Sequence, residues 1–394
     1  MAELISSKFE DGTLTIFFHR RVDSANAAAV QAETEEALAA AGSCSVIIDA
    51  DDLQYISSAG LRIVLAVRKK HPELRVINAS SEVYEIFEMT GFTEMITVEK
   101  GYRKISVEGC EEIGRGANGT VYRMDEDTII KVYNNPDSLP DIQRERELAR
   151  RAFVLGVPTA IPYDVVRVGG SYGSVFELLN AASFIRLCVK EPENIDKWID
   201  MSVDLLKIIH STEVRPEDMP DMKAVAVGWV DFLKDYLDAG VWQKIHDLVD
   251  AVPESHMMMH GDYHMKNVML QNGEALLIDM DTLAQGDPIF EFGSIYNAYV
   301  GFSELDHSVA QTFLGISYET AVYIWDRTIR QYFGTEDGEK LKVIEEKAKL
   351  MGYIRLMRRL IRRHGLENEE GRAAIDFYAK EIGRIAGSLD RLTF

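Results

Sequence analysis

One short stretch of the chain holds residue types that could carry out phosphoryl transfer. His260, Gly261 and Asp262 are followed by Asn267, and an apolar run then ends at Asp279. Transfer of a phosphoryl group from a nucleotide needs one carboxylate that orients the attacking hydroxyl, and further oxygen ligands that hold Mg2+. Asp262 fits the first role, and Asn267 together with Asp279 fits the second.

The segment between Asn267 and Asp279 predicts how these residues come together. A Gln-Asn-Gly turn at 271–273 lies between two apolar runs, which is typical of a β-hairpin. Such a hairpin would return Asp279 to the side of Asn267. A single His-x-Asp is often accidental, however, and an Asp at the end of a strand often serves only a turn. The hypothesis therefore depends on a second motif.

That second motif lies far upstream and is rich in glycine. Gly114, Gly116 and Gly119 are flanked by strand-like residues, and an apolar stretch with Lys131 at its centre follows. Glycines let the backbone approach phosphates closely, because no Cβ intervenes. A GxGxxG pattern alone is weak evidence, since three glycines can also form a plain turn. A lysine on the next strand and the later Asp262 stretch make the set typical of a nucleotide-dependent kinase.

Two further features belong to the predicted nucleotide site. A helix predicted over 141–155 carries Glu145 and Glu147 near its start, and either could pair with Lys131; the other would belong to a solvated charged face. A strand predicted over 173–179 ends at Glu177 and Leu179. We expect backbone groups there to hold the adenine, so the identity of these side chains carries no information.

Composition limits the class of protein. A chain of 394 residues suggests two or three domains, and 46% hydrophobic with 27% charged residues is typical of a soluble globular protein. With 64 acidic and 43 basic residues the net charge is -21, which repels nucleic acid and anionic lipid. No nucleic-acid partner is therefore expected.

The cysteines and the N-terminus bear on the cellular compartment. Cys44, Cys110 and Cys188 are few, far apart and without a CxxC pattern, which argues against a disulfide framework or a zinc site. The N-terminus lacks a basic segment followed by an apolar core, and no apolar run reaches about 18 residues. We expect a cytoplasmic protein with no membrane span.

The first hundred residues alternate between strand-like and helix-like segments. Apolar runs at 13–18, 45–49 and 74–77 predict strands, and helical patterns cover about 24–42, 58–71 and 81–90. This alternation implies an α/β domain with a mixed sheet. A polar, glycine-containing segment at 99–106 indicates a domain boundary near Gly101.

The turn before the second predicted helix reads Ser57-Ser58-Ala59-Gly60-Leu61. With this turn, residues 1 to about 98 resemble the STAS family, the domain shared by anti-sigma factor antagonists and sulfate transporter tails. In those antagonists the turn is usually Asp-Ser-Ser/Thr-Gly-Leu, and a partner kinase phosphorylates the Ser after the Asp. The resemblance therefore implies that Ser58 is a candidate phosphorylation site and that a protein partner binds this domain.

A phosphate on Ser58 would suit the start of a helix, where unpaired amides and the macrodipole favour negative charge. This sequence departs from the antagonists in two places, because Ser57 replaces the Asp and Ala59 replaces the following Ser/Thr. The alternative is that Ser57 or Ser58 only caps the helix, which contributes about 1 kcal/mol.

Three motifs mark the second half of the chain. Residues 260–267 read HGDYHMKN, an Ile-Asp pair lies at 278–279, and residues 286–292 read GDPIFEF. With these motifs, residues 105 to about 300 resemble the aminoglycoside phosphotransferase and choline kinase branch of the protein-kinase-like fold. That branch has GDPxxDL in the last motif, so Glu291-Phe292 is a departure at a position of structural importance.

The resemblance implies roles for the site residues. Asp262 would be the catalytic base or orienting residue, Asn267 and Asp279 would be Mg2+ ligands, and Lys131 would contact the α- and β-phosphates of ATP. Family spacing favours Glu145 over Glu147 as the partner of Lys131. His260 is expected to pack under the loop.

The same resemblance implies the architecture. We predict an α/β STAS domain at 1–100, followed by a two-lobed α+β kinase-like domain with a β-rich N-lobe at 101–179 and a mostly helical C-lobe at 180–394. Helical patterns at 195–210, 222–239 and 241–251 agree with that C-lobe. A basic helix near 354–363 is expected to be amphipathic with solvated arginines; the alternative is that it anchors an anionic substrate or a partner.

Two functional hypotheses follow. In the first, the chain is an ATP- and Mg2+-dependent kinase that phosphorylates a hydroxyl of a small molecule. Its STAS domain then serves as a regulatory or docking module. In the second, the kinase unit serves signalling and modifies protein, including Ser58 in trans, or only binds nucleotide. The presence of Lys131, Asp262, Asn267 and Asp279 argues against an inactive kinase.

Overall fold

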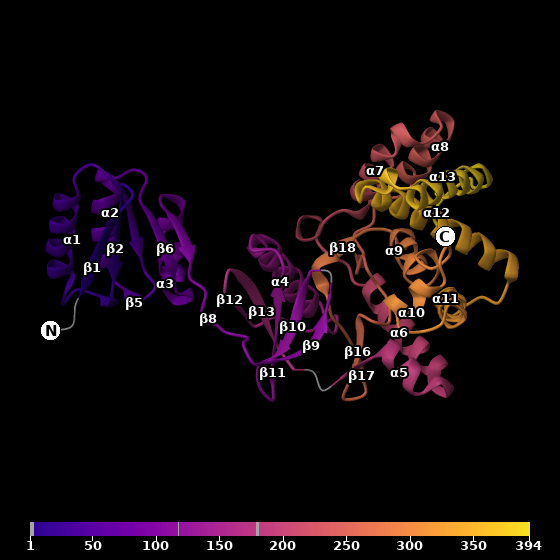
Figure 1. Ribbon diagram of the computed structural model, residues 1–394, viewed down its shortest axis with the longest axis horizontal. Coiled ribbons are helices and arrows are strands. Elements are labelled where there is room, and N and C mark those ends of the chain that lie inside the picture. Colours follow the sequence, from indigo (N-terminus) through magenta and orange to yellow (C-terminus); the bar gives the residue numbers. More distant parts are fainter. Residues whose placement is uncertain (1–3, 117, 179–180) are drawn as a thin grey trace. The chain divides into compact units, whose positions relative to one another are not determined.

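A computed structural model describes residues 4–116, 118–178 and 181–394 of the chain (Figure 1). Contacts divide the chain into two compact units. The first spans 1–108 together with 165–172, and the second spans 109–164 together with 173–394.

A five-stranded mixed sheet forms the centre of the first unit. Its strand order is β1-β2-β4-β6-β7, in which β1 is antiparallel to β2 and the other neighbours are parallel. The strands are β1 (Ile5–Glu10), β2 (Thr13–Phe18), β4 (Ser45–Asp49), β6 (Arg75–Ala79) and β7 (Thr97–Lys100). In β2 the residues alternate between buried and half-buried, because successive side chains point to opposite faces of the sheet. The mixed α/β prediction is confirmed.

Three helices pack against this sheet (Figure 1): α1 (Ala27–Ala41), α2 (Ser58–Lys70) and α3 (Ser81–Met89). Two short strands, β3 (Arg20–Val22) and β5 (Leu53–Ile56), pair in parallel just before α2. The strands β8 (Lys104–Ile105) and β12 (Asp164–Val168) also pair in parallel.

The second unit begins with antiparallel strands in the order β13-β11-β10-β9. These are β9 (Glu111–Arg115), β10 (Gly119–Arg123), β11 (Thr128–Tyr133) and β13 (Ser171–Glu177), and α4 (Leu139–Val154) follows β11 along the chain. The hairpin β9–β10 contains the three glycines, and β11 carries Lys131. These strands and α4 agree with the β-rich N-lobe that the sequence predicted.

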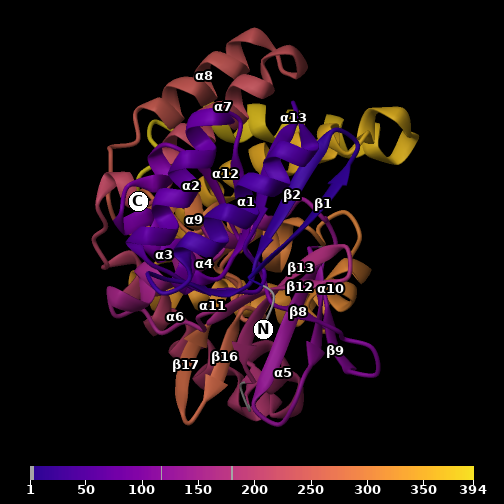
Figure 2. The ribbon, with the colours of Figure 1, turned by 90° about the vertical axis from the view of Figure 1, so that its left-hand side faces the viewer.

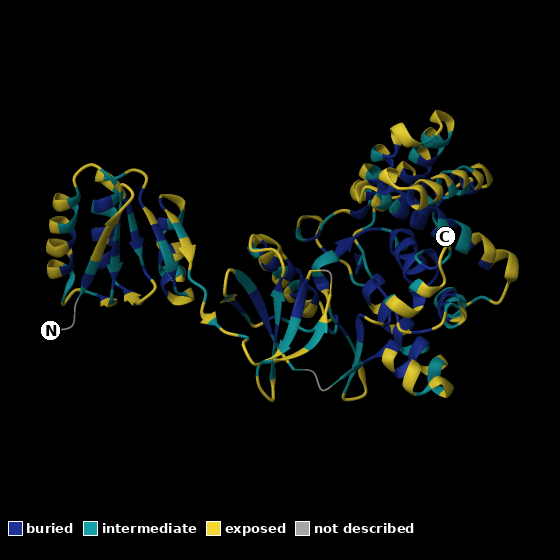
Figure 3. Ribbon diagram, viewed as in Figure 1, coloured by how far each residue is buried: buried dark blue, intermediate teal, exposed yellow. Residues whose placement is uncertain are grey.

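The remainder of the second unit is mostly helical. Its helices are α5 (Phe184–Lys190), α6 (Ile195–His210), α7 (Met222–Phe232), α8 (Ala239–Asp250), α9 (Pro288–Tyr296), α10 (Ser308–Phe313), α11 (Tyr318–Phe333), α12 (Gly338–Arg362) and α13 (Glu369–Ser388). Short strands hold the site segments: β14 (Ala182–Ser183), β15 (Met258–Met259), β16 (Val268–Gln271), β17 (Glu274–Leu277) and β18 (Ala284–Gln285). The hairpin β16–β17 lies beside α5 (Figure 2). Helix α9 is buried from Ile289 onward and packs on α12 (Figure 3).

One helix prediction was wrong in extent. The periodicity predicted a continuous helix over 222–239, but α7 ends at Phe232 and a 3-10 turn follows. The Asp238 carboxylate accepts a hydrogen bond from the Gly240 amide at 2.9 Å and so caps the start of α8. The chain must leave the helical conformation before this cap, which separates α7 from α8.

Among the described residues, no helix is both long enough and apolar enough to cross a membrane.

Candidate active site

The hairpin β16–β17 brings two predicted site residues together. Val268 pairs with Leu277 and Gln271 with Glu274, so the hairpin closes at Asn272 and Gly273. Both turn residues have positive φ, at 52° and 87°, as a tight primed turn requires.

The pairing continues beyond the strands into the site. The Ile278 amide donates to the Asn267 carbonyl at 3.0 Å, which places the residue before Asp279 against Asn267. The expected return of Asp279 to the side of Asn267 is therefore present. Asp279 itself adopts a left-handed conformation with φ of 64°, so the chain turns sharply at this carboxylate.

The loop that carries Asp262 is constrained on both sides. Gly261 has φ of 83°, and a Cβ there would collide with the Thr282 carbonyl oxygen, so only glycine fits. The Asn267 side-chain amide donates to the Asp262 carbonyl at 3.1 Å. His260 is fully buried; its Nδ1 accepts from the Asp262 amide at 3.3 Å, and its Nε2 contacts the Ile278 carbonyl at 3.2 Å. His260 therefore packs under the loop, as expected.

Glu291, which the motif comparison placed only at a position of structural importance, proves to be part of this site. Its carboxylate is fully buried and accepts hydrogen bonds from three loop amides: His260 at 2.6 Å, Gly261 at 3.0 Å and Tyr263 at 3.4 Å. Burial alone would raise the pKa of Glu291, but His210, His260 and the Gly261 amide outweigh it and lower the pKa. The available signal was one carboxylate in the otherwise apolar α9.

Asp262 lies among positively polarised groups. His264 Nε2 is 3.7 Å from the Asp262 carboxylate, and Arg355 of α12 donates to the neighbouring Gly261 carbonyl at 3.0 Å. Burial would raise the pKa of Asp262, but His264, Arg355 and His260 outweigh it and hold the pKa well below its ordinary value. Asp262 is therefore ionised at neutral pH and can accept a hydrogen bond from a hydroxyl.

Lys131, on strand β11, forms ion pairs with Glu145 of α4 and with Asp279, which lies just after the β16–β17 hairpin. Its Nζ is 3.3 Å from Glu145 Oε1 and 2.9 Å from Asp279 Oδ1. Burial would lower the pKa of Lys131, but Glu145 and Asp279 outweigh it and raise the pKa, so the ammonium stays charged. Glu147 pairs instead with Arg150 and Arg151. Of the two candidate glutamates, Glu145 is the one beside Lys131.

The three glycines of the hairpin β9–β10 differ in their surroundings. A Cβ on Gly119 would collide with the Val132 carbonyl oxygen of β11, whereas the nearest atoms to a Cβ on Gly114 and on Gly116 lie at 4.0 and 3.9 Å. The Gly116 amide donates to the Gly119 carbonyl at 2.9 Å and closes the turn. Gly119 is therefore required for strand packing, and Gly116 leaves open space in the turn.

One cavity of about 420 Å³ connects these parts. Its lining includes Gly116, Gly119, Lys131, Glu145, Glu177, Asp262, Asn267, Asp279 and Arg355. Gly114 is not among the lining residues, and Leu179 lies outside the described residues. The site residues predicted from two distant motifs thus surround a single space within the second unit.

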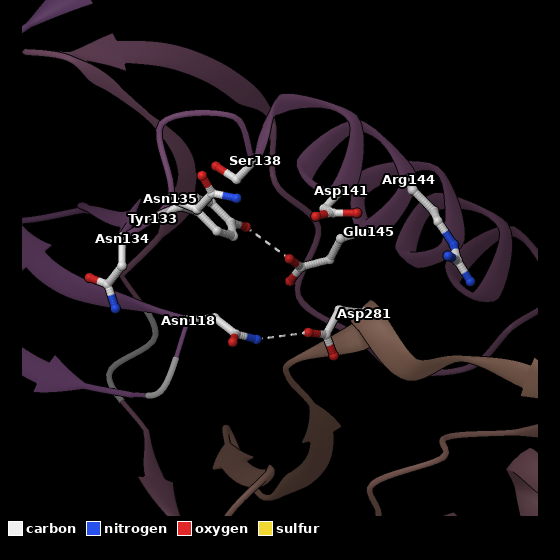
Figure 4. A pocket seen from close by; sticks show the side chains of 9 residues that line it. All are labelled: Asn118, Tyr133, Asn134, Asn135, Ser138, Asp141, Arg144, Glu145 and Asp281. Atoms are coloured by element: carbon white, nitrogen blue, oxygen red, sulfur yellow. Dashed lines mark hydrogen bonds between the residues drawn. The ribbon is translucent and has the colours of Figure 1, made fainter. Parts of the chain in front are cut away.

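Asp281 adds a second carboxylate next to Asp279. Burial, together with the charges of Asp279 and Glu145, raises the pKa of Asp281 to about 7. Its Oδ2 accepts a hydrogen bond from the Asn118 side chain at 3.3 Å, which links the glycine turn to the hairpin segment (Figure 4). A second cavity of about 330 Å³ lies beside this link and also reaches Glu145. This second cavity adjoins the main cavity, since both are lined by Asn118, Glu145 and Asp281.

The fit to a divalent cation can be judged from the oxygen atoms. Within the described residues there is no cluster of three His, Cys, Asp or Glu side chains that could hold a metal by themselves. Asn267 uses its Nδ2 toward Asp262, which leaves its Oδ1 as a ligand, and Lys131 contacts only Oδ1 of Asp279. Mg2+ usually takes one or two protein oxygens and completes its shell with phosphates and water. The residues present fit that pattern.

Ser58 is the first residue of α2 and is exposed. The hydroxyl of Ser57 caps this helix, accepting from the Ala59 amide at 3.2 Å and the Gly60 amide at 3.4 Å. The cap is therefore provided by Ser57, and the Ser58 hydroxyl is not needed for it.

Comparisons with known proteins match both units. The model of the phosphotransferase enzyme family matches residues 109–323, and the STAS domain model matches residues 5–105. The putative anti-sigma factor antagonist BtrV of Bordetella bronchiseptica (strain ATCC BAA-588 / NCTC 13252 / RB50) is 39% identical over 92 residues, covering 22% of this chain and 78% of that protein.

Solved structures resemble the chain at low sequence identity. A choline/ethanolamine kinase family protein from Mesorhizobium loti is 16% identical with a TM-score of 0.44, covering 70% of this chain and 87% of that one. The ADP-bound aminoglycoside phosphotransferase APH(2'')-Ib is 14% identical with a TM-score of 0.46, covering 79% of this chain and 99% of that one.

Proposed function

Because this chain belongs to the phosphotransferase enzyme family, we propose that it transfers the γ-phosphoryl group of ATP to a hydroxyl of a small molecule, with Mg2+ as cofactor. One observation carries the proposal: Lys131, Asp262, Asn267 and Asp279 line one cavity, although they come from segments far apart in the chain. The turn of the Gly-rich hairpin lines the same cavity, which supports nucleotide binding there.

In the proposed mechanism Asp262 accepts a hydrogen bond from the acceptor hydroxyl and aligns its oxygen with the γ-phosphorus. The new oxygen–phosphorus bond forms as the bond to the β-phosphate oxygen breaks, ADP leaves, and the hydroxyl proton passes to the Asp262 carboxylate. Because the pKa of Asp262 is low, this carboxylate is a weak base and acts chiefly by orientation. Lys131, which lines the same cavity beside Asp279, would bind phosphate oxygens.

Mg2+, held by Asn267 and Asp279, would neutralise charge on the phosphates. The carboxylates of Asp279 and Glu145 contribute to the raised pKa of Asp281, so this part of the cavity favours a cation. Lys131 supplies one positive charge, and a bound divalent cation would supply the rest.

Substitution at Asp262 and at Asp279 tests this division of roles. We expect Asp262→Ala to lower phosphoryl transfer by roughly 100-fold or more while nucleotide affinity stays nearly unchanged, because Asp262 orients the acceptor and holds no metal. Asp279→Ala should weaken both phosphoryl transfer and nucleotide affinity, because Asp279 is a proposed Mg2+ ligand. Nucleotide affinity is measured by calorimetric titration with Mg2+ and AMP-PNP, and transfer by ADP release. Lys380→Gln, an exposed change on α13, is the matched control.

The assignment would be wrong if Asp262→Ala turned over an acceptor at the wild-type rate. Equal nucleotide affinity in Asp279→Ala and wild type at every Mg2+ concentration would contradict the metal role.

Residues 5–105 are a STAS domain, and we propose that it regulates the kinase unit or docks a protein. A second candidate function is phosphorylation of protein, including Ser58 of another copy of this chain. One observation favours it: Ser58 is exposed at the start of α2 while Ser57 already caps that helix. We also propose a cytoplasmic location, where ATP is available and where the free thiols of the three cysteines would persist.

A further inference from the structure

Three arginines lie on one face of α12 next to the proposed active site. Arg355, Arg358 and Arg359 are spaced at i, i+3 and i+4, so their side chains neighbour one another; we call them the arginine ridge. Arg355 lines the main cavity and donates to the Gly261 carbonyl at 3.0 Å and to the Ser294 hydroxyl at 2.5 Å. Its position therefore ties the ridge to the loop that carries Asp262.

The arginine ridge has no direct ion-pair partner among the described residues. In the part of the chain that the structure describes, none of the three arginines forms an ion pair with a carboxylate, although acidic residues outnumber basic ones by 64 to 43. The Arg358 Nε atom is buried and has no hydrogen-bond partner among those residues. A buried charged donor without a partner is costly, and an anion bound to the other guanidinium nitrogens of Arg358 would offset part of that cost.

Aromatic rings surround the ridge in place of carboxylates. The guanidinium of Arg355 lies 5.6 Å from the ring centre of Trp229, and that of Arg358 lies 5.6 Å from Phe232; both rings belong to α7, which contacts α12 (Figure 1). The guanidinium of Arg359 lies 5.0 Å from the ring of Phe302. These contacts hold the side chains in place and leave their charge available.

The pKa values of Arg358 and Arg359 agree with a role of the ridge in binding an anion. Burial, together with the charges of Arg362 and Arg355, lowers the pKa of Arg358. Burial and the charges of Arg363 and Arg355 likewise lower the pKa of Arg359, and the opposing carboxylate is Asp262. Asp262 therefore lies within electrostatic reach of Arg359.

We propose that the acceptor carries an anionic group, a carboxylate or a phosphate, which Arg358 and Arg359 bind while the acceptor hydroxyl lies at Asp262. This inference rests on the proposed function and narrows its substrate class. The sequence favoured solvated arginines on this helix. Arg359, Arg362 and Arg363 are exposed as expected, whereas Arg355 and Arg358 are half-buried and Arg355 holds the catalytic loop. A polycationic acceptor would be repelled by the ridge at close range.

A set of matched compounds tests the inference. Glucose, glucosamine, glucuronate and glucose 6-phosphate serve as probes that differ mainly in charge, and calorimetric titration of the full chain measures their binding with and without Mg2+ and AMP-PNP. We expect at least one anionic probe to bind about tenfold or more tightly than glucose, and glucosamine to bind weakest. Comparison of glucuronate with glucose 6-phosphate separates a carboxylate site from a phosphate site.

Variants of Arg359 test whether the preference for anionic probes depends on the arginine ridge. Arg359→Gln should remove most of the anion preference, Arg359→Lys should keep part of it because the charge remains, and the control Lys380→Gln should keep all of it. Thermal unfolding of each variant monitors its folding. The inference is overturned if glucose or glucosamine binds as tightly as both anions, if no probe binds, or if Arg359→Gln retains the full preference.

The same titrations separate this inference from the function on which it rests. Failure of the chain to bind Mg2+ and AMP-PNP contradicts the proposed function. The binding of anionic probes in the absence of nucleotide still reports on the ridge.

Discussion

At the scale of single residues, the geometry of the catalytic loop depends on Glu291. Its carboxylate accepts from the amides of His260, Gly261 and Tyr263, and the same loop positions Asp262. The loop backbone has positive φ at Gly261 and would not hold this shape without such anchors. A carboxylate can serve several amides at once, whereas an amide side chain offers only one accepting oxygen.

We expect Glu291→Gln to destabilise the chain by roughly 2 kcal/mol or more and to lower kcat more than it changes nucleotide affinity. Because the folded-state pKa of Glu291 is lowered, its contribution is fully present above the ordinary pKa of a glutamate. The contribution is lost as pH falls below that value. The difference in Tm between variant and wild type should therefore be large at pH 7 and shrink in acid, as measured by scanning calorimetry.

Glu274→Gln, at an exposed position in the β16–β17 hairpin, is the matched control and should change Tm little. Equal Tm values for Glu291→Gln and wild type at pH 7 would contradict the anchoring role.

Motif spacing predicted the chemical residues but not their supports. Asp262, Asn267, Asp279 and Lys131 stand in patterns whose chemistry is readable from residue type. Glu291 accepts hydrogen bonds from backbone amides, and such bonds have no sequence signature. The sequence showed Glu291 only as a departure from the GDPxxDL motif.

At the scale of elements, the Gly-rich hairpin combines a packing role with a binding role. Gly119 lies against the backbone of β11 at Val132, so its missing side chain keeps β10 and β11 in register. Gly116 has open space and is the better candidate for approach to phosphate. The two glycines are therefore expected to respond differently to substitution.

We expect Gly119→Ala to cost roughly 1–3 kcal/mol of stability, because the new Cβ forces β10 and β11 apart. Gly114→Ala, whose Cβ would have its nearest neighbour at 4.0 Å, should leave Tm nearly unchanged and is the control. Urea unfolding at equilibrium gives both values. The same loss of stability in both variants would show that the collision at Val132 is not the cause.

The sequence predicted elements well where a clear apolar pattern exists. The apolar runs predicted β2 and β4 to the residue, and helical periodicity predicted α6 to the residue. Strand β1, which reads ISSKFE, was missed because only Ile5 is buried and the other residues are polar except for Phe9, which is exposed. Its pairing with β2 depends on backbone hydrogen bonds, which composition does not reveal.

At the scale of the whole molecule, one chain combines a STAS domain with a phosphotransferase. We propose the boundary near Gly101, with the kinase-like lobes at 101–179 and 180–394. Gly101 itself still contacts the first unit, because its amide donates to the Ala79 carbonyl at 2.7 Å, and residues 102–108 and 165–172 also group with that unit. The sequence alone identified both families, since each has local motifs, but it could not identify the acceptor, because no motif in the chain specifies it.

We expect Ser58 to be phosphorylated in trans. A phosphate there adds about two negative charges at a helix start and would alter association with a partner. A 15N-labelled Asp262→Ala chain is mixed with unlabelled wild type and Mg-ATP, and peptide mass mapping locates phosphate on the labelled chain. A labelled chain that also carries Ser58→Ala is the control. Absence of phosphate on labelled Ser58 would contradict this prediction and leave the STAS domain as a docking module.

The central claim is that the cavity around Lys131, Asp262, Asn267 and Asp279 performs Mg2+-dependent phosphoryl transfer to a hydroxyl. The most direct test is ADP release by the full chain with ATP and a panel of small hydroxylated compounds, neutral, cationic and anionic. We expect acceptor-dependent ADP release that stops when EDTA removes Mg2+ and when Asp262 is replaced by alanine. Acceptor-dependent release that persists in Asp262→Ala, or a panel in which no acceptor raises ADP release above the acceptor-free level, would contradict it.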